Sequence, residues 1–189
     1  MYLFFDTETT GVPRNYKASV EDSNNWPRMV QIAWLVYNSD KIKVDEQQFI
    51  IKPEGYIIPK EVSKLHGITT ERAISEGKDL QFVLNLFNTQ IEESQFIIAH
   101  NISFDEKIVG AEFFRKKINS KLFNKPRLCT MHASTNYCKI PGNYGYKWPK
   151  LSELHIKLFG KDFEDAHNAA ADIEATAKCF WKLRELKLI

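Results

Sequence analysis

The sequence predicts a mixed α/β fold in which helices cover both faces of one sheet. Three apolar runs come before the first helical pattern, and two further short apolar runs alternate with helical patterns. Strands interleaved with helices in this way favour a sheet covered on both sides. The 189 residues contain no repeat, low-complexity tract or linker. Since domains cluster near about 100–200 residues, we expect residues 1–189 to form a single domain.

The first three strands are predicted from runs of apolar residues. Residues 2–8 carry apolar and aromatic side chains on both faces, which is typical of a central strand. Residues 29–38 and 45–52 form two more runs. The Asn-Ser-Asp-Lys sequence at 38–41 has hairpin turn chemistry, so these two strands should pair antiparallel. The polar segment 12–28 has no assigned role.

The rest of the chain alternates helical and strand patterns. Leu80, Val83, Leu84, Phe87 and Ile91 recur at helical spacing. Ser103 is a plausible cap for a helix over 103–118, and Asn168 for a last helix that ends near residue 186. The remaining predicted elements are short helices at 59–65 and 148–159 and strands at 95–99 and 127–131.

The composition is that of a folded protein, with 43% hydrophobic and 13% aromatic residues. No apolar run reaches the roughly 18 residues of a membrane span, and the start Met-Tyr-Leu-Phe-Phe-Asp is unlike a signal peptide. Three cysteines are too few for a secreted disulfide framework. We therefore expect a cytoplasmic protein with no membrane partner.

The charge is unevenly distributed along the chain. The net charge is +2, but residues 107–161 contain 12 Lys or Arg and two acids, a net of +10. A basic segment of this kind fits either a polyanion partner or a solvated surface. Within it, residues 141–149 form an aromatic loop between Lys139 and Lys150. Its rings could stack on bases beside a phosphate track or pin the loop to the core.

Acidic residues gather at the ends of predicted elements. Asp6 and Glu8 lie two apart on the first strand, so they project from the same face. Their repulsion must be relieved by a proton or a cation, and burial on a central strand adds to the cost. Asp105 falls in the first turn of a helix, where acids are favoured in general. His167 precedes the last helix, and Asp172 lies one turn inside it.

Together these side chains offer four carboxylates and one histidine, which is what a two-metal phosphoryl-transfer site requires. Carboxylate oxygens suit Mg²⁺ or Mn²⁺. Two such ions, roughly 3.5–4 Å apart, can activate a water and stabilise the leaving oxygen. A histidine whose pKa is near neutrality is the natural base for that water.

Three segments in order resemble a known family. Residues 5–11 read Phe-Asp-Thr-Glu-Thr-Thr-Gly, residues 100–105 read His-Asn-Ile-Ser-Phe-Asp, and four residues separate His167 from Asp172. These are similar to the motifs of the DEDDh-type (DnaQ-like) 3′–5′ exonucleases, which include the proofreading epsilon subunit of bacterial DNA polymerase III. Residues 30–33 and 65–69 also resemble segments of these enzymes. The resemblance extends from residue 2 to about residue 177.

The resemblance implies a ribonuclease H-like fold with a five-stranded mixed sheet, and it implies residue roles by position. Two divalent metal ions, Mg²⁺ or Mn²⁺, would be held by Asp6, Glu8, Asp105 and Asp172. His167 would deprotonate the attacking water. The terminal nucleotide would contact Thr7, Thr9, Thr10 and Gly11, its sugar would lie near His66, and the penultimate nucleotide would lie near Asn101 and Phe104.

The implied reaction is hydrolysis of a nucleic-acid 3′ end with release of nucleoside 5′-monophosphates. The expected partner is DNA, either single-stranded or as a 3′ end. RNA is an alternative substrate, because trimming enzymes such as RNase T and oligoribonuclease share the motifs. A second alternative is a non-catalytic nucleic-acid-binding module. A further alternative is a zinc module, with irregular spacing, built from Cys129, His132, Cys138 and His155. The end at Ile189 lacks an evident polymerase-binding tail, which favours a stand-alone nuclease, and the oligomeric state is not indicated.

Overall fold

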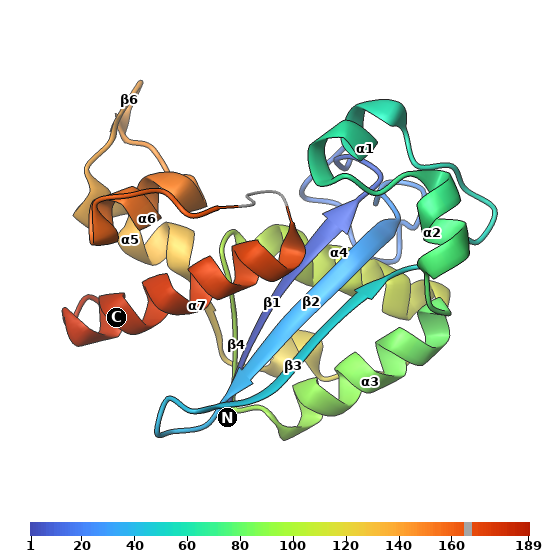
Figure 1. Ribbon diagram of the computed structural model, residues 1–189, viewed down its shortest axis with the longest axis horizontal. Helices are drawn as coiled ribbons and strands as arrows, with labels where there is room; N and C mark the ends of the chain where they lie inside the picture. The colour runs from blue at the N-terminus through green and yellow to red at the C-terminus, as the bar shows by residue number, and fades with distance from the viewer. Residues whose placement is uncertain (165–167) are drawn as a thin grey trace.

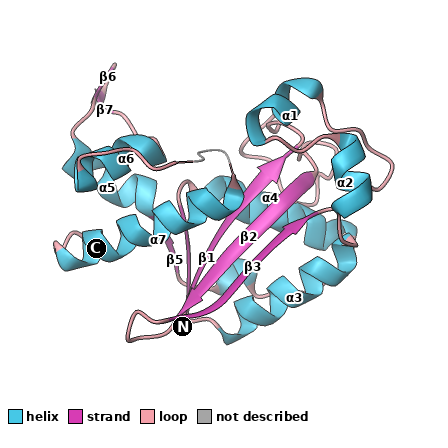
Figure 2. Cartoon of the chain, in the orientation of Figure 1, coloured by secondary structure: helices cyan, strands magenta, loops and turns pink. Residues whose placement is uncertain are grey.

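The computed structural model describes residues 1–164 and 168–189, and its central feature is a five-stranded sheet (Figures 1 and 2). In the described part of the chain the strand order is β3-β2-β1-β4-β5. The strands are β1 (Tyr2–Thr9), β2 (Met29–Tyr37), β3 (Lys43–Ile50), β4 (Phe96–Ala99) and β5 (Arg127–Cys129). The first strand is therefore central, as its apolar character predicts.

The sheet is mixed, as predicted. β2 pairs antiparallel with both β1 and β3, whereas β4 and β5 run parallel to β1. The β2–β3 hairpin turns at Asn38, whose side-chain oxygen accepts hydrogen bonds from the backbone N–H groups of Asp40 and Ile42. β3 is the exposed edge, and its polar and charged side chains discourage pairing with another sheet edge.

Helices cover both faces of the sheet. Neighbouring side chains on a strand point to opposite faces. The ring of Phe4 lies 5.1 Å from that of Phe180 on α7, and the ring of Phe5 lies 5.3 Å from that of Phe87 on α3. Figure 1 accordingly shows α7 across the near face and α4 behind the strands. The helices are α1 (Lys60–His66), α2 (Thr70–Glu76), α3 (Leu80–Glu93), α4 (Ile102–Arg115), α5 (Thr130–Cys138), α6 (Leu151–Phe159) and α7 (Ala169–Glu185).

The last helix is buried on two sides. Ala169, Ile173 and Phe180 belong to the main core against the sheet. Cys179 and Leu183 belong to a second apolar cluster against α5 and α6, and both are fully buried. This double burial fixes α7 tightly across the sheet. No described helix combines the length and the apolar character that a membrane crossing requires.

Several predicted boundaries differ from the structure. The helix expected from residue 103 begins at Ile102, and its cap residue is Asn101 in the left-handed conformation (φ 68°), not Ser103. The helix expected from residue 148 begins at Leu151, because Pro149 and the extended Lys150 precede it. The expected strand 127–131 ends at Cys129, because α5 begins at the next residue. The sequence patterns predict neither α5 nor α2. The aromatic loop contains a small hairpin of β6 (Pro141–Gly142) and β7 (Gly145–Tyr146).

The polar segment 12–28 is attached to α4. Trp26 is buried, and its indole N–H donates to the carbonyl of Ser19 at 2.9 Å. The guanidinium of Arg115 donates to the carbonyls of Ser23 and Trp26 at 2.5 and 2.7 Å. Lys107 donates to the carbonyl of Tyr16. These contacts anchor a segment that has few apolar residues of its own.

A fully buried carboxylate joins this segment to the sheet. Glu112 on α4 is 0% exposed. Its Oε1 accepts from Arg28 Nε at 2.9 Å and from the backbone N–H of Met29 at 3.0 Å, and it pairs with Arg115 Nη1 at 3.1 Å. Since a buried carboxylate is costly unless it is paired, this network fixes the start of β2 against α4.

Candidate active site

The first strand places its two acids on the face that α7 covers. Phe4 packs on α7, and strand alternation puts Asp6 and Glu8 on the same side. Both acids are partly exposed, whereas Thr7, on the other face, is only 7% exposed. The acids are therefore the accessible groups at this end of β1.

Asp172 joins them from the first turn of α7. Asn168 caps the helix as predicted, since its side-chain oxygen accepts from the backbone N–H of Ala170 at 3.0 Å. The alanines at 169–171 keep the helix start free of bulky side chains. One ligand oxygen from each of Asp6, Glu8 and Asp172 lies within 4.8 Å of the others. Three carboxylates from distant parts of the chain thus converge.

Asp105 approaches from the opposite face of the sheet. It lies in the first turn of α4 and is 4% exposed. Its Oδ1 accepts from the backbone N–H of Thr7 at 3.1 Å and from the Thr7 hydroxyl at 2.7 Å. Asp105 is outside the three-oxygen group of Asp6, Glu8 and Asp172, yet its charge raises the pKa of Asp6. Thr7 is therefore the residue that holds the fourth acid beside the first.

The acids raise one another's pKa. Burial raises the pKa of Asp6 well above its usual value, and the charges of Asp105, Asp172 and Glu8 add to the effect. Burial and the charges of Asp172 and Asp105 raise the pKa of Glu8 to about 8. Burial also raises the pKa of Asp105 to about 7, although the hydrogen bonds from Thr7 oppose the shift. A cluster of hard oxygen donors that disfavours its own ionisation fits a divalent cation, which would replace the protons.

The stability of the metal-free protein is expected to fall as pH rises from about 4.5 to about 8. Across this range the folded state retains a proton on Glu8, whose pKa is raised from 4.5 to about 8, whereas the unfolded state has released it. The free energy of unfolding must then decrease with pH. Thermal unfolding in EDTA, measured against pH, tests this.

Two additions make that measurement specific. Saturating Mg²⁺ or Mn²⁺ should flatten the decline, since a cation bound to the folded state stabilises it. In EDTA, Glu8→Gln should have a shallower decline than the wild type. A wild-type melting temperature that does not change with pH or with metal would contradict this account of the cluster.

The residues after the acids form a tight turn. The Thr9 hydroxyl donates to the carbonyl of Gly11 at 2.6 Å, and Gly11 adopts φ 149°. Thr10 is fixed on both sides by Arg28, because its backbone N–H donates to the Arg28 carbonyl and its hydroxyl accepts from the Arg28 N–H. The four predicted substrate-contacting positions from Thr7 to Gly11 therefore have defined conformations beside the cluster.

His66 lies at the end of α1 and is 8% exposed. Its Nδ1 accepts from the backbone N–H of Ile68 at 3.2 Å. Burial lowers the pKa of His66, and the nearby backbone of Thr9 partly opposes the shift. The structure thus brings this predicted sugar-contacting residue to the turn that follows β1, in its neutral form at neutral pH.

The second motif lies at the start of α4. Asn101 is the left-handed cap residue, and its side-chain oxygen accepts from the Ser103 hydroxyl at 3.4 Å. Phe104 is partly buried and packs against the main core. Phe104 directly precedes Asp105, and Asn101 lies one helical turn earlier in the chain. His167, the predicted base, lies outside the described residues.

A cavity of about 360 Å³ opens beside the cluster, and its lining includes residues beyond the predicted site. His100 lines it, with Nδ1 3.0 Å from the Thr130 hydroxyl and Nε2 3.0 Å from the Pro149 carbonyl. Burial lowers the pKa of His100 to about 4, so its ring is uncharged at neutral pH. His100 is the first residue of the second family motif, but no local sequence pattern indicates that Thr130 and Pro149 are its hydrogen-bond partners. The lining residues are Asp6, His100, Lys150, Leu151, Ser152, Phe163 and Asp172.

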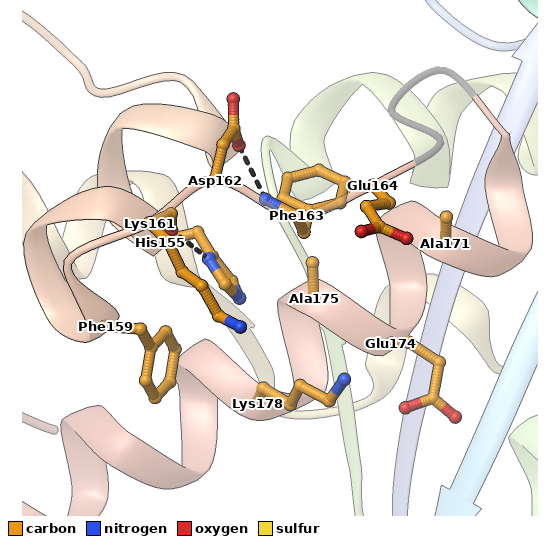
Figure 3. Close-up of a pocket in the computed structure, with 10 residues that line it drawn as sticks. All are labelled: His155, Phe159, Lys161, Asp162, Phe163, Glu164, Ala171, Glu174, Ala175 and Lys178. Carbon is orange, nitrogen blue, oxygen red and sulfur yellow. Dashed lines mark hydrogen bonds between the residues drawn. The ribbon is translucent and has the colours of Figure 1, made fainter.

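A larger cavity of about 520 Å³ lies between α6 and α7 and shares Phe163 with the first (Figure 3). His155 Nδ1 lies 2.8 Å from the Lys161 carbonyl, and its ring lies 5.4 Å from that of Phe163. None of the four predicted metal-binding acids lines this cavity. The structure also does not support the zinc alternative, since no group of converging ligands among the described residues includes Cys129, His132, Cys138 or His155.

Comparison with known proteins decides the family. The sequence profile of the RNase T exonuclease family matches residues 3–180. The chain belongs to the RNase T exonuclease family. This confirms the resemblance to DnaQ-like 3′–5′ exonucleases and, at the level of the family, the predicted class of enzyme.

Relatives of this RNase T family chain include two bacterial proteins named as DNA polymerase III components or types. The epsilon subunit of DNA polymerase III from Aquifex aeolicus is 28% identical over 131 residues, 69% of this chain and 60% of that protein. The PolC-type DNA polymerase III of Latilactobacillus sakei is 27% identical over 184 residues, 97% of this chain and 11% of that protein. The chain thus spans three-fifths of one relative and about a tenth of the other.

Solved structures confirm the fold. E. coli Exonuclease I in complex with a dA16 oligonucleotide superimposes with a TM-score of 0.78 at 19% identity, and covers 99% of this chain and 41% of the other. The apo form of exonuclease I has a TM-score of 0.76. This family member therefore has the ribonuclease H-like fold that the motifs imply.

Proposed function

We propose that the chain is a metal-dependent 3′–5′ exonuclease that hydrolyses DNA from its 3′ end and releases nucleoside 5′-monophosphates. The observation that supports this most directly is the convergence of oxygens from Asp6, Glu8 and Asp172 within 4.8 Å, with Asp105 held next to them by Thr7. Family membership supports the same reaction. The names of the relatives favour DNA as the substrate.

The acids would bind two divalent cations, Mg²⁺ or Mn²⁺. Bound there, the ions would supply Lewis-acid activation of a water and charge stabilisation at the leaving oxygen. Asp6, Glu8 and Asp172 bring one ligand oxygen each within 4.8 Å of the others, and Asp105 has one oxygen bonded to Thr7. Asp105 therefore both orients the strand end and contributes charge.

The other site residues would bind and orient the 3′ end. The turn from Thr9 to Gly11 presents backbone groups beside the acids. His66 is uncharged at neutral pH, so it would donate a hydrogen bond to a sugar hydroxyl without attracting phosphate. Asn101 and Phe104, at the start of α4, would contact the next nucleotide.

His167 is the proposed general base. His167→Ala is expected to lower turnover by roughly 100-fold or more, the usual contribution of a positioned base, while Mn²⁺ binds as in the wild type. Calorimetric titration of Mn²⁺ together with turnover on a 3′-labelled strand measures both. An equal loss of metal affinity would instead make His167 a metal ligand.

The proposed function is tested by the products formed from a single strand and from a 3′-tailed duplex, each as DNA and as RNA, in Mg²⁺ and in EDTA. On DNA, the expected result is a descending ladder of products with release of mononucleotides in Mg²⁺ and no cleavage in EDTA. Faster release from RNA would assign the chain to RNA trimming, which depends on contacts to the 2′-hydroxyl. Binding without release would assign it to the nucleic-acid-binding modules.

A further inference from the structure

The aromatic loop forms an exposed hairpin. Residues 139–150 contain three lysines, two tyrosines, one tryptophan and no acid. β6 and β7 pair within this segment, and Figure 1 shows the hairpin standing off the α5–α6 end of the molecule. The side chains of Tyr144, Tyr146 and Trp148 are 104%, 50% and 63% exposed. Rings that pinned the loop to the core would be buried, so packing does not explain them.

The tryptophan is held in place although it is exposed. Its ring lies 4.9 Å from that of His132 on α5, at an angle of 46°. The next residue, Pro149, places its carbonyl 3.0 Å from His100 Nε2, which fixes the base of the hairpin to the end of β4. An aromatic surface that is fixed before it is occupied loses little entropy when a flat ligand stacks on it.

The hairpin is continuous with the site of the acids. Lys150, at its end, lines the cavity of about 360 Å³ that also contains Asp6 and Asp172. His100, to which the hairpin is bonded, lines the same cavity. A strand whose 3′ end reaches the acids could therefore continue past Lys150 toward the exposed rings.

The charge of the hairpin fits a polyanion. Lys147 is paired with Glu153 at 2.6 Å. Lys139 and Lys150 flank the rings at the two ends of the segment, within the stretch of the chain that has a net charge of +10. Aromatic rings between cations are the common means of binding single-stranded nucleic acid without sequence preference.

We propose that the hairpin 139–150 is a docking surface for single-stranded nucleic acid on the 5′ side of the nucleotide being removed. The bases stack on Tyr144, Tyr146 and Trp148, and Lys139 and Lys150 contact the backbone. The placement of the bound strand on the 5′ side rests on the proposed 3′–5′ exonuclease function. It assigns the hairpin to substrate retention and not to the chemistry.

The test compares the double variant Tyr144→Ser/Tyr146→Ser with Tyr144→Phe/Tyr146→Phe, which keeps the rings. Phe82→Ser removes a ring of similar exposure (52%) from α3 and serves as the control. Two substrates are used, dT12 and the p-nitrophenyl ester of thymidine 5′-monophosphate. The ester has a single nucleotide and no 5′ chain that could extend to Tyr144 and Tyr146. Binding of fluorescein-labelled dT12 in EDTA is measured by anisotropy.

The serine variant is expected to bind dT12 about 10-fold more weakly and to show a similar loss of kcat/KM on dT12, through KM. Its kcat/KM on the ester should equal that of the wild type. The phenylalanine and Phe82→Ser variants should behave as the wild type on both substrates.

The outcomes separate the two proposals. Unchanged dT12 binding by the serine variant overturns the docking surface, whatever the catalytic result. Equal losses on dT12 and on the ester also overturn it, because the hairpin would then act on the active site itself. A wild type that binds dT12 through the hairpin but cleaves neither substrate contradicts the exonuclease function and leaves the docking surface standing.

Discussion

Asp6→Ala is expected to abolish nucleotide release, lowering the rate by about 1,000-fold or more, with the fold intact. Metal ions contribute several kcal/mol of charge stabilisation to such reactions, and each ~1.4 kcal/mol is a factor of ten in rate. Asp6 is the member of the three-oxygen group whose pKa is raised by the charges of all three other acids. Its removal therefore disrupts the site at its centre.

The same substitution should not destabilise the metal-free protein. The ionised Asp6 is partly withdrawn from solvent and is repelled by the neighbouring acids, so its loss relieves an unfavourable interaction. Thermal unfolding in EDTA at pH 8 should give a melting temperature at or above that of the wild type. Asp40→Asn, in the β2–β3 turn, is the matched control and should leave both activity and stability unchanged. Wild-type activity in a well-folded Asp6→Ala protein would refute the proposed function.

Glu112→Ala is expected to lower the free energy of unfolding by about 3–5 kcal/mol, the usual cost of removing one partner from a buried ion pair. The substitution removes the shared acceptor of Arg28, Arg115 and the Met29 N–H. The melting temperature should then fall by roughly 6–20 °C, given ~2–4 °C per kcal/mol for a chain of this size. Urea unfolding at neutral pH gives the free energy directly.

A surface ion pair provides the comparison. Glu92 pairs with Lys121 at 3.1 Å, but both side chains are largely exposed. Glu92→Ala should cost no more than about 1 kcal/mol. Glu112→Gln keeps the shape and an acceptor oxygen, so it should fall between the two. Similar losses from the Glu92 and Glu112 variants would show that the buried network contributes no more than a surface pair.

The elements that carry the clearest patterns are those that the sequence predicts best. β1 reads as a central strand because both of its faces are apolar, and the structure pairs it on both sides. The start of α7 is indicated by the cap residue Asn168, whose hydrogen bond is present. Asp6 and Glu8 share a face because strand geometry leaves no alternative.

Other features depend on contacts that no local pattern encodes. α5 was not predicted because its sequence, Thr-Met-His-Ala-Ser-Thr-Asn-Tyr-Cys, is largely polar; Ser134 donates to the Thr130 carbonyl within the helix. The bond between Thr7 and Asp105 joins residues 98 positions apart. Asp105 alone resembles an ordinary helix-start acid, and only the fold reveals that Thr7 holds it. His100 likewise becomes a neutral bridge only through Thr130 and Pro149.

The joining of the first strand to the last helix also has a consequence for the order of folding. Phe4 packs on Phe180, and the Tyr2 hydroxyl accepts from Arg184 across 182 positions of the chain. Such distant contacts form late, because the entropy cost of closing a long loop must be met before the contacts can stabilise the fold. During synthesis, Asp6 and Glu8 are made well before Asp172, which cannot reach them until α7 has been made and has docked. The cluster of acids is thus assembled late in folding, and a partly made chain carries Asp6 and Glu8 without the complete site.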